Sequence, residues 1–356
     1  MAVAALLGGA LLEPARLRWD APALLLLGLF VAGLASATLS PHSASILRNN
    51  LDLLRTLATY WVFLNLVRTE RQAYLVVELL LASAVAAFLL SVNQLNGFKG
   101  VAIASLGYCN NVGMYYSMIA ALALSLSLCA KASRPRQAWW ALALGTSLAA
   151  MAVAALCRSA LLGFGVFAAL ALLVSGTRQR RRYSALLLAA LVCLVAVAAG
   201  DLTELKDLGF EFGSLAERWR IWRLAGSLFL EHPLLGVGPG NFMSAVRALL
   251  ADNVGGFYYL GNAHSLYLNT LAERGLIGLI LLLAFFGAAI HRLRRAASTL
   301  ATPQATALWL AGLGAVLIVL IIGLLDHPLH HEHALLMATL LALPLAQEPR
   351  GHRLVG

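Results

Sequence analysis

Charge is scarce in this sequence. Of its 356 residues only 12% are Asp, Glu, Lys or Arg, whereas 61% are hydrophobic, and the mean hydropathy is +0.82. A soluble domain carries about a quarter charged residues, so this composition excludes a soluble globular protein. The sequence predicts an all-α, polytopic membrane helical bundle.

Cysteine is also scarce, and the four cysteines show no metal-binding spacing. Cys109, Cys129, Cys157 and Cys193 lie in or beside apolar runs, without a Cys-x-x-Cys pair, so we interpret them as small membrane-buried residues. A bridge between Cys109 and Cys157 stays open, because the predicted topology places both near the outer face. The net charge of +10 is interpreted as a topological signal rather than as a nucleic-acid surface.

Apolar segments of membrane-spanning length recur along the chain. The opening residues 1–12 reach only about 18 Å of the roughly 30 Å hydrocarbon core, so they predict a half-span or the remnant of a longer first helix. The whole pattern predicts about 11–12 transmembrane helices. The other predicted spans are residues 22–40, 52–67, 73–93, 112–130, 137–157, 158–175, 184–200, 266–290, 305–325 and 334–346.

The basic residues orient these spans. Cytoplasmic loops are enriched in Lys and Arg, and simple alternation of the spans places 16 of the 26 basic residues on one side, with the run Arg178–Arg182 among them. We therefore expect one membrane domain with a cytoplasmic side at 176–183 and 291–296. Its parts are N-terminal helices at 1–200, an exoplasmic loop with short helices at 201–264, and C-terminal helices at 265–356, with a second exoplasmic loop at 326–333.

The outer loop contains a predicted amphipathic helix. Residues 214–230 (SLAERWRIWRLAGSLFL) place Arg218 and Trp222 four positions apart, so both lie on one helix face. One interpretation is an interfacial helix, because Trp and Arg are typical at headgroup depth. The other is that the planar guanidinium of Arg218 binds phosphate. The two are compatible, since a lipid diphosphate lies at the same depth.

Two further polar residues are conspicuous in apolar surroundings. Arg158 lies at the seam of two predicted spans, where a cation is costly unless it is paired or faces a cavity. The alternative is an arginine that reaches the membrane surface from a helix end. His264 ends the polar stretch beside Asn262, and imidazole titrates near neutral pH, so it can accept a proton from a hydroxyl nucleophile. A structural histidine is the alternative.

Two loops have compositions that suggest ligands. Gly236-x-Gly238-x-Gly240 does not follow a strand, so we interpret it as a structural turn rather than a dinucleotide site. The loop at 326–333 (DHPLHHEH) is rich in histidine, but its spacing matches no familiar zinc motif. We expect a polar rim there and predict no metal.

Three segments together resemble the O-antigen ligase/polymerase superfamily. Cys157-Arg158-Ser159 is similar to the Ser-Arg motif of that family, and the resemblance covers roughly residues 105–290. The segments are Arg218-x-x-x-Trp222, HPLLGVGPGNF at 232–242, and His264-Ser265-x-Tyr267-Leu268 followed by Glu273-x-Gly275-x-x-Gly278.

The resemblance implies a bacterial inner-membrane glycosyltransferase that needs no metal or other cofactor. Such enzymes take a glycan from undecaprenyl diphosphate on the periplasmic face. Arg158 and Arg218 are implied to bind the diphosphate, and His264 to activate or position the acceptor hydroxyl. The expected partners are the lipid-linked donor, the acceptor and membrane lipids, with no nucleic acid. The expected supporting residues are Arg220, Trp222, Arg223, Asn262 and Glu273.

Four functions stay open at this stage. A ligase passing the glycan to lipid A–core is the leading expectation, and a polymerase passing it to another lipid-linked repeat is the nearest rival. A flippase or transporter would also hold arginines for a lipid diphosphate, but it predicts charged or broken helices at mid-membrane. A structural, non-enzymatic membrane protein would leave His264 without a task.

Overall fold

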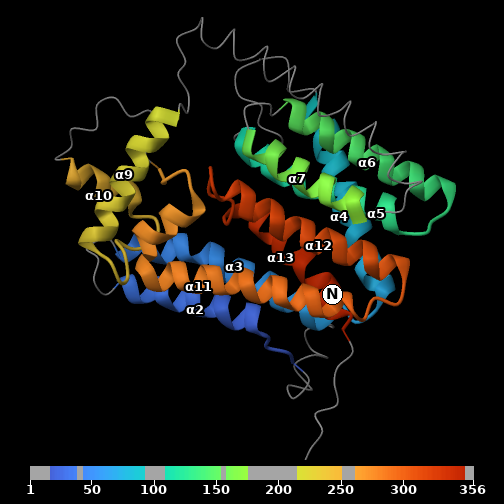
Figure 1. The fold of residues 1–356 in the computed structure, drawn as a ribbon, viewed down its shortest axis with the longest axis horizontal. Coiled ribbons are helices and arrows are strands. Elements are labelled where there is room, and N and C mark those ends of the chain that lie inside the picture. Colours follow the sequence, from blue (N-terminus) through green and yellow to red (C-terminus); the bar gives the residue numbers. More distant parts are fainter. Residues whose placement is uncertain are drawn as a thin grey trace, which may run out of the picture.

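The computed structural model describes residues 17–37, 43–92, 109–153, 158–174, 215–250 and 261–348. Every regular element in these ranges is a helix (Figure 1), so the predicted all-α fold is confirmed. The helices are α2 (Ala21–Ala37), α3 (Ser43–Leu66), α4 (Glu70–Val92), α5 (Cys109–Cys129), α6 (Arg134–Val153), α7 (Arg158–Val174), α9 (Leu215–Glu231), α10 (Phe242–Leu249), α11 (Leu266–Ala297), α12 (Pro303–Ile322) and α13 (His331–Ala346).

The chain is a multi-pass membrane protein. Helices α4, α5, α11 and α12 are long and apolar enough to cross a bilayer, and α2, α7 and α13 are shorter apolar helices. Nine of the described helices coincide with predicted spans, whereas the spans expected at 1–12 and 184–200 lie outside the described residues. The largest difference is α3, which begins at Ser43 rather than at residue 52. Its polar early turns find partners in the protein: the Asn50 side chain donates to the Phe30 carbonyl oxygen at 2.7 Å.

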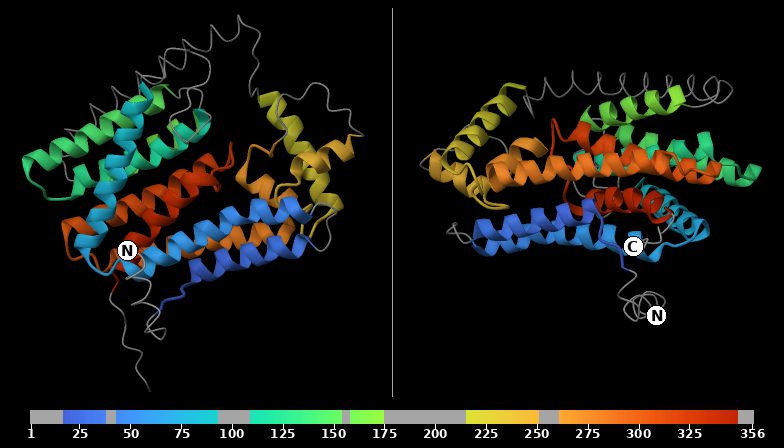
Figure 2. Two further views of the ribbon diagram at one scale, coloured as in Figure 1. Left: turned by 180° about the vertical axis from the view of Figure 1, so that it is seen from behind. Right: turned by 60° about the horizontal axis from the view of Figure 1, so that its bottom comes forward.

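The helices form three packed groups. Helices α2, α3 and α11 run side by side at one edge, α4 to α7 form the opposite edge, and α12 and α13 lie between them (Figures 1 and 2). Helix α12 packs on α5, α7 and α13, and α13 packs on α3. The buried core runs through all three groups and includes Tyr116, Trp140, Phe167 and Phe285.

Helices α9 and α10 stand at one end of this bundle (Figure 1). They share a second, smaller apolar core with the start of α11, which joins Ile221, Ala225 and Leu228 of α9 to Phe242 and Val246 of α10 and to Ala263 and Ala272. This outer core holds α9 firmly on α11. The predicted helix at 214–230 is confirmed, and its packing on α10 and α11 fixes the positions of the residues that it carries.

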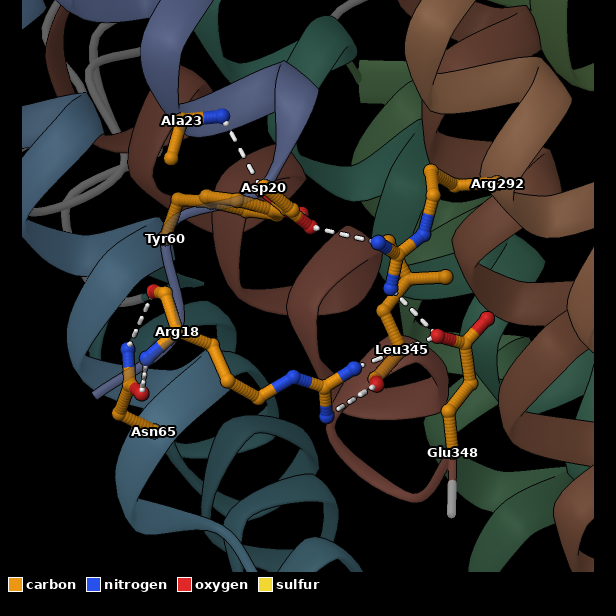
Figure 3. Close-up of polar contacts among 8 residues, drawn as sticks. All are labelled: Arg18, Asp20, Ala23, Tyr60, Asn65, Arg292, Leu345 and Glu348. Carbon is orange, nitrogen blue, oxygen red and sulfur yellow. Dashed lines mark hydrogen bonds and ion pairs between the residues drawn. The ribbon is translucent and has the colours of Figure 1, made fainter. Parts of the chain in front are cut away.

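A network of ion pairs and hydrogen bonds lies at the end of the bundle opposite α9 and α10 (Figure 3). Arg292 of α11 pairs with Asp20 at 3.7 Å and with Glu348, and Arg18 also reaches Glu348, at 3.4 Å. Tyr60 of α3 donates to Asp20 at 2.7 Å. Arg18 lies just before α2 and Arg292 lies near the end of α11, and alternation of the predicted spans places both residues on one side. Their contact with the same carboxylate shows that both lie at this end of the bundle, and the side of the membrane stays a prediction.

Candidate functional site

The site is built around a break in α11 at Gly275. The backbone there has φ 65° and ψ −164°, so the helix is interrupted. In an unbroken helix the N–H groups of Leu276 and Ile277 would donate to the carbonyls of Ala272 and Glu273. Buried backbone groups need other partners when such bonds are lost.

The glycine-rich loop after α9 supplies those partners. Val237 and Gly238 donate to the carbonyls of Ala272 and Glu273 at 3.0 and 2.8 Å. Conversely, Leu276 and Ile277 donate to the carbonyls of Pro233 and Leu234 at 2.8 and 3.3 Å. The loop thus replaces both lost helical bonds and docks into the break.

Glycine is required on both sides of this junction. Gly236 has φ 66°, and a Cβ there would overlap the backbone of Glu273. A Cβ on Gly275 would overlap the Leu234 carbonyl. The interpretation of Gly236-x-Gly238-x-Gly240 as a structural turn is confirmed, with the added finding that the turn is hydrogen-bonded to the backbone of α11.

Glu273 anchors the junction from inside. Its side chain is buried, with 7% of its surface exposed, and it accepts from the Phe242 backbone N–H at 3.4 Å and from the Asn269 side chain at 3.1 Å. The neighbouring Arg274 reaches the other way and donates to Asn50 of α3 at 2.9 Å. Both of these adjacent charged side chains are therefore satisfied by protein groups, as their cost in a membrane requires.

His264 lies two residues before the start of α11, in a constrained turn. Its φ angle is 46°, the only positive φ among the described non-glycine residues. Its backbone N–H donates to the Asn262 side chain at 2.8 Å, and the preceding N–H of Ala263 donates to Asn269 at 3.0 Å. Asn262 thus supports His264 as a turn residue, which is a local role that its side chain performs well.

The turn at His264 is tied to the end of α12. The Leu266 N–H donates to the carbonyls of Gly323 and Asp326 at 2.8 and 2.9 Å, and the Ser265 hydroxyl donates to Gly323 at 3.3 Å. Arg218 of α9 donates through Nη1 to the carbonyl oxygen of Leu325 in the same turn. The histidine segment and the Arg218 guanidinium therefore meet at one structural feature, the turn at 323–326.

The other predicted residues of α9 differ in exposure. Trp222 is half-buried beside Arg218, and its indole N–H is buried without a hydrogen-bond partner among the described residues. Arg220 and Arg223 are exposed, and so is Trp219, whose ring stands 6.5 Å from that of Trp222. Arg218 and Trp222 thus line the seam between α9 and the bundle, whereas Arg220 and Arg223 face away from it.

Arg158 opens α7, and its side chain lies outside the described part of the structure. The level of its backbone is fixed by packing. A Cβ on Gly163 would lie 3.4 Å from the Ile318 carbonyl oxygen, and one on Gly314 would touch Phe167, so α7 and α12 run antiparallel. Arg158 lies five residues before Gly163, about 7.5 Å further along the helix, which brings it level with the turn after α12. Its convergence with Arg218 stays a prediction.

The histidine-rich loop lies beside this turn. The rings of His327 and His330 stack at 5.3 Å, and that of His333 stands edge-on to His330 at 4.6 Å. Among the described residues no group of three or more His, Cys, Asp or Glu side chains has a metal-binding arrangement. The rings of this segment pack against one another. His333 lies in the first turn of α13 and is fully buried, so it does not contribute to the expected polar rim.

The arrangement brings the His264 segment and the Arg218 guanidinium together at one end of the bundle. Sequence reasoning missed Asn269, which links Glu273 to the turn of His264. It also missed the break at Gly275. The available signals were the adjacent charges Glu273 and Arg274 in an apolar helix, followed by two glycines.

Comparison with known proteins adds a family to this geometry. Residues 143–283 match the family model described as O-Antigen ligase. The matched segment contains Arg158, Arg218, His264 and Glu273, together with the loop docked into α11. It confirms the resemblance seen in the motifs. No curated protein matches the chain.

Proposed function

We propose that this chain, a member of the O-antigen ligase superfamily, transfers a glycan from undecaprenyl diphosphate to an acceptor hydroxyl. The preferred acceptor is lipid A–core, and the site faces the periplasm from the inner membrane. The observation that carries the proposal is the junction at the turn 323–326, which holds both the His264 segment and the Arg218 guanidinium. A base for the acceptor and a cation for the leaving group are then close together.

The donor is bound through its diphosphate. Arg218 uses one guanidinium nitrogen on the Leu325 carbonyl, which orients the planar group and leaves other N–H donors for phosphate oxygens. Arg158 begins α7 at the level of the same turn and adds a second cation. These arginines stabilise the negative charge that develops on the departing diphosphate. The proposed mechanism therefore contains no step that depends on a metal.

The transfer is a single displacement. The acceptor oxygen attacks the anomeric carbon, and the bond from that carbon to the diphosphate oxygen breaks. His264 accepts the proton of the acceptor hydroxyl, which makes a weak nucleophile competent. Attack opposite the leaving group inverts the configuration at the anomeric carbon. The diphosphate leaves with the electron pair of the broken bond.

The broken helix α11 does not favour a transporter. The interval from Gly275 to Arg292 is 17 helical residues, or about 25 Å, close to the roughly 30 Å hydrocarbon core. Because basic residues mark the cytoplasmic surface, Arg292 would lie at one edge of the hydrocarbon core. We therefore expect the break near the outer edge of the membrane rather than at its midplane, where a transported substrate would bind. The described polar residues of the site gather at that same edge.

The test is transfer in vitro from purified lipid-linked glycan, with a chelator present throughout. His264→Ala is expected to slow transfer by about 10²–10⁴-fold with little change in donor affinity, because general-base catalysis contributes that much. His291→Ala is the matched control, since His291 is exposed near the opposite end of α11. Wild-type turnover by folded His264→Ala protein would remove this residue from the mechanism.

The acceptor separates the ligase from the polymerase. The same preparation is offered lipid A–core in one reaction and a second lipid-linked repeat in another. A ligase transfers only to lipid A–core, whereas a polymerase lengthens the lipid-linked glycan. Transfer to the repeat alone would replace the ligase by the polymerase and leave the donor site as described.

A further inference from the structure

The backbone of His264 adopts a conformation that its residue type disfavours. A side chain in the left-handed region crowds the following carbonyl, and such a residue persists only where its surroundings enforce the conformation. His264 is the one described non-glycine residue with a positive φ, at 46°. The contacts that fix its neighbours therefore decide where the imidazole lies.

Those contacts hold the turn from both sides. On the C-terminal side, the Leu266 N–H is bonded to the turn after α12. On the N-terminal side, the buried Ala263 N–H donates to Oδ1 of Asn269 at 3.0 Å. Asn269 lies one turn into α11 and is itself buried, so this hydrogen bond is shielded from water.

The orientation of the Asn269 amide is fixed by Glu273. Asn269 Nδ2 donates to Glu273 Oε2 at 3.1 Å, and Glu273 Oε1 accepts from the Phe242 N–H at 3.4 Å. A carboxylate can only accept, so Asn269 must turn its NH₂ group toward Glu273. Its oxygen is then left facing the Ala263 N–H, as the turn requires.

We infer that Asn269 is a positioning residue, which sets the imidazole of His264 for proton acceptance without touching substrate. Glu273 acts one step further back, by orienting the Asn269 amide and joining it to the loop docked in α11. This inference rests on the proposed role of His264. A displacement of a catalytic group by about 1 Å can cost 10²-fold in rate, so the effect is measurable in turnover.

The first variant is Asn269→Ala. Its turnover, per folded molecule, is expected to fall by about 10–10²-fold, while donor affinity stays unchanged because the arginines are untouched. The matched control is Asn65→Ala at the opposite end of the bundle (Figure 3). Asn65 is also buried and also accepts a backbone N–H, that of Arg18 at 2.7 Å. Equal turnover losses in the two variants, or none in Asn269→Ala, would overturn the inference.

A double variant separates this inference from the proposed function. If Asn269 acts through His264, adding Asn269→Ala to His264→Ala slows the enzyme no further. If the double variant loses the full Asn269→Ala factor again, Asn269 acts elsewhere and the positioning role fails, although the function stands. If His264→Ala alone keeps wild-type turnover, the function itself fails.

A swap variant guards against simple misfolding. In Asn269→Asp combined with Glu273→Gln, the new carboxylate accepts from Ala263 and from the new amide, whose oxygen still accepts from Phe242. All three hydrogen bonds are kept, and only the bond between the side chains at 269 and 273 has its donor and acceptor exchanged. Each single change breaks the set, so we expect the singles to be slow and the swap to recover most of the turnover. A folded swap variant no faster than the Asn269→Asp single variant would refute the positioning role.

Discussion

The backbone N–H of Gly238 donates to the carbonyl oxygen of Glu273 at 2.8 Å. The bond joins the loop that follows α9 to the interior of α11, across 35 positions of sequence. It exists because α11 is broken at Gly275, which leaves the Glu273 carbonyl without its helical donor. The turn at His264 and the loop that follows α9 are thereby parts of one hydrogen-bonded unit.

Gly275→Ala is expected to damage this unit. A residue with a side chain at φ 65° costs about 1–3 kcal/mol, and the added Cβ would also overlap the Leu234 carbonyl. The thermal unfolding midpoint of the purified protein should fall, and transfer should fall with it. Gly287→Ala is the control in the same helix, because a Cβ there meets nothing within 4 Å. A Gly275→Ala midpoint equal to that of the control would show that the break is not needed.

The nine spans that coincide with described helices were predictable because hydropathy is a local property. The shared helix face of Arg218 and Trp222 was predictable, because residues four positions apart lie on one side of a helix. The break in α11 was not, because the apolar pattern continues on both sides of Gly275 and the replacement hydrogen bonds come from a distant loop. Asn269 was missed for a related reason. In the sequence it is a single polar residue on a helix, and its structural role becomes visible only through its hydrogen bonds with Ala263 and Glu273.

Arg218→Ala is expected to weaken donor binding. The loss of one charge-assisted contact costs about 1.5–3 kcal/mol, which is ten- to hundredfold in affinity for undecaprenyl diphosphate species. Arg218→Lys should recover only part, because an ammonium cannot make the bidentate contact. Arg158→Ala should change affinity in the same direction.

The control for these arginine variants is Arg247→Ala. Arg247 is an exposed cation of α10, in the same outer region, so it reports on loss of general positive charge. Binding is measured with the purified protein in detergent, and unfolding midpoints confirm that each variant is folded. An Arg218→Ala affinity equal to that of Arg247→Ala would remove Arg218 from the donor site.

The predicted sidedness can be checked with single cysteines in a protein whose native cysteines are replaced. Leu249→Cys reports on the outer helix α10, where Leu249 is 36% exposed, and Ser298→Cys reports on the exposed turn after α11. A membrane-impermeant maleimide applied to cells with an intact inner membrane should label position 249 and reach position 298 only after lysis. Basic loops remain cytoplasmic, and Arg292 to Arg295 directly precede the second probe. Labelling at 298 with protection at 249 would show that the bundle has the opposite orientation. His264 and Arg218 would then face the cytoplasm, and a periplasmic donor would be excluded.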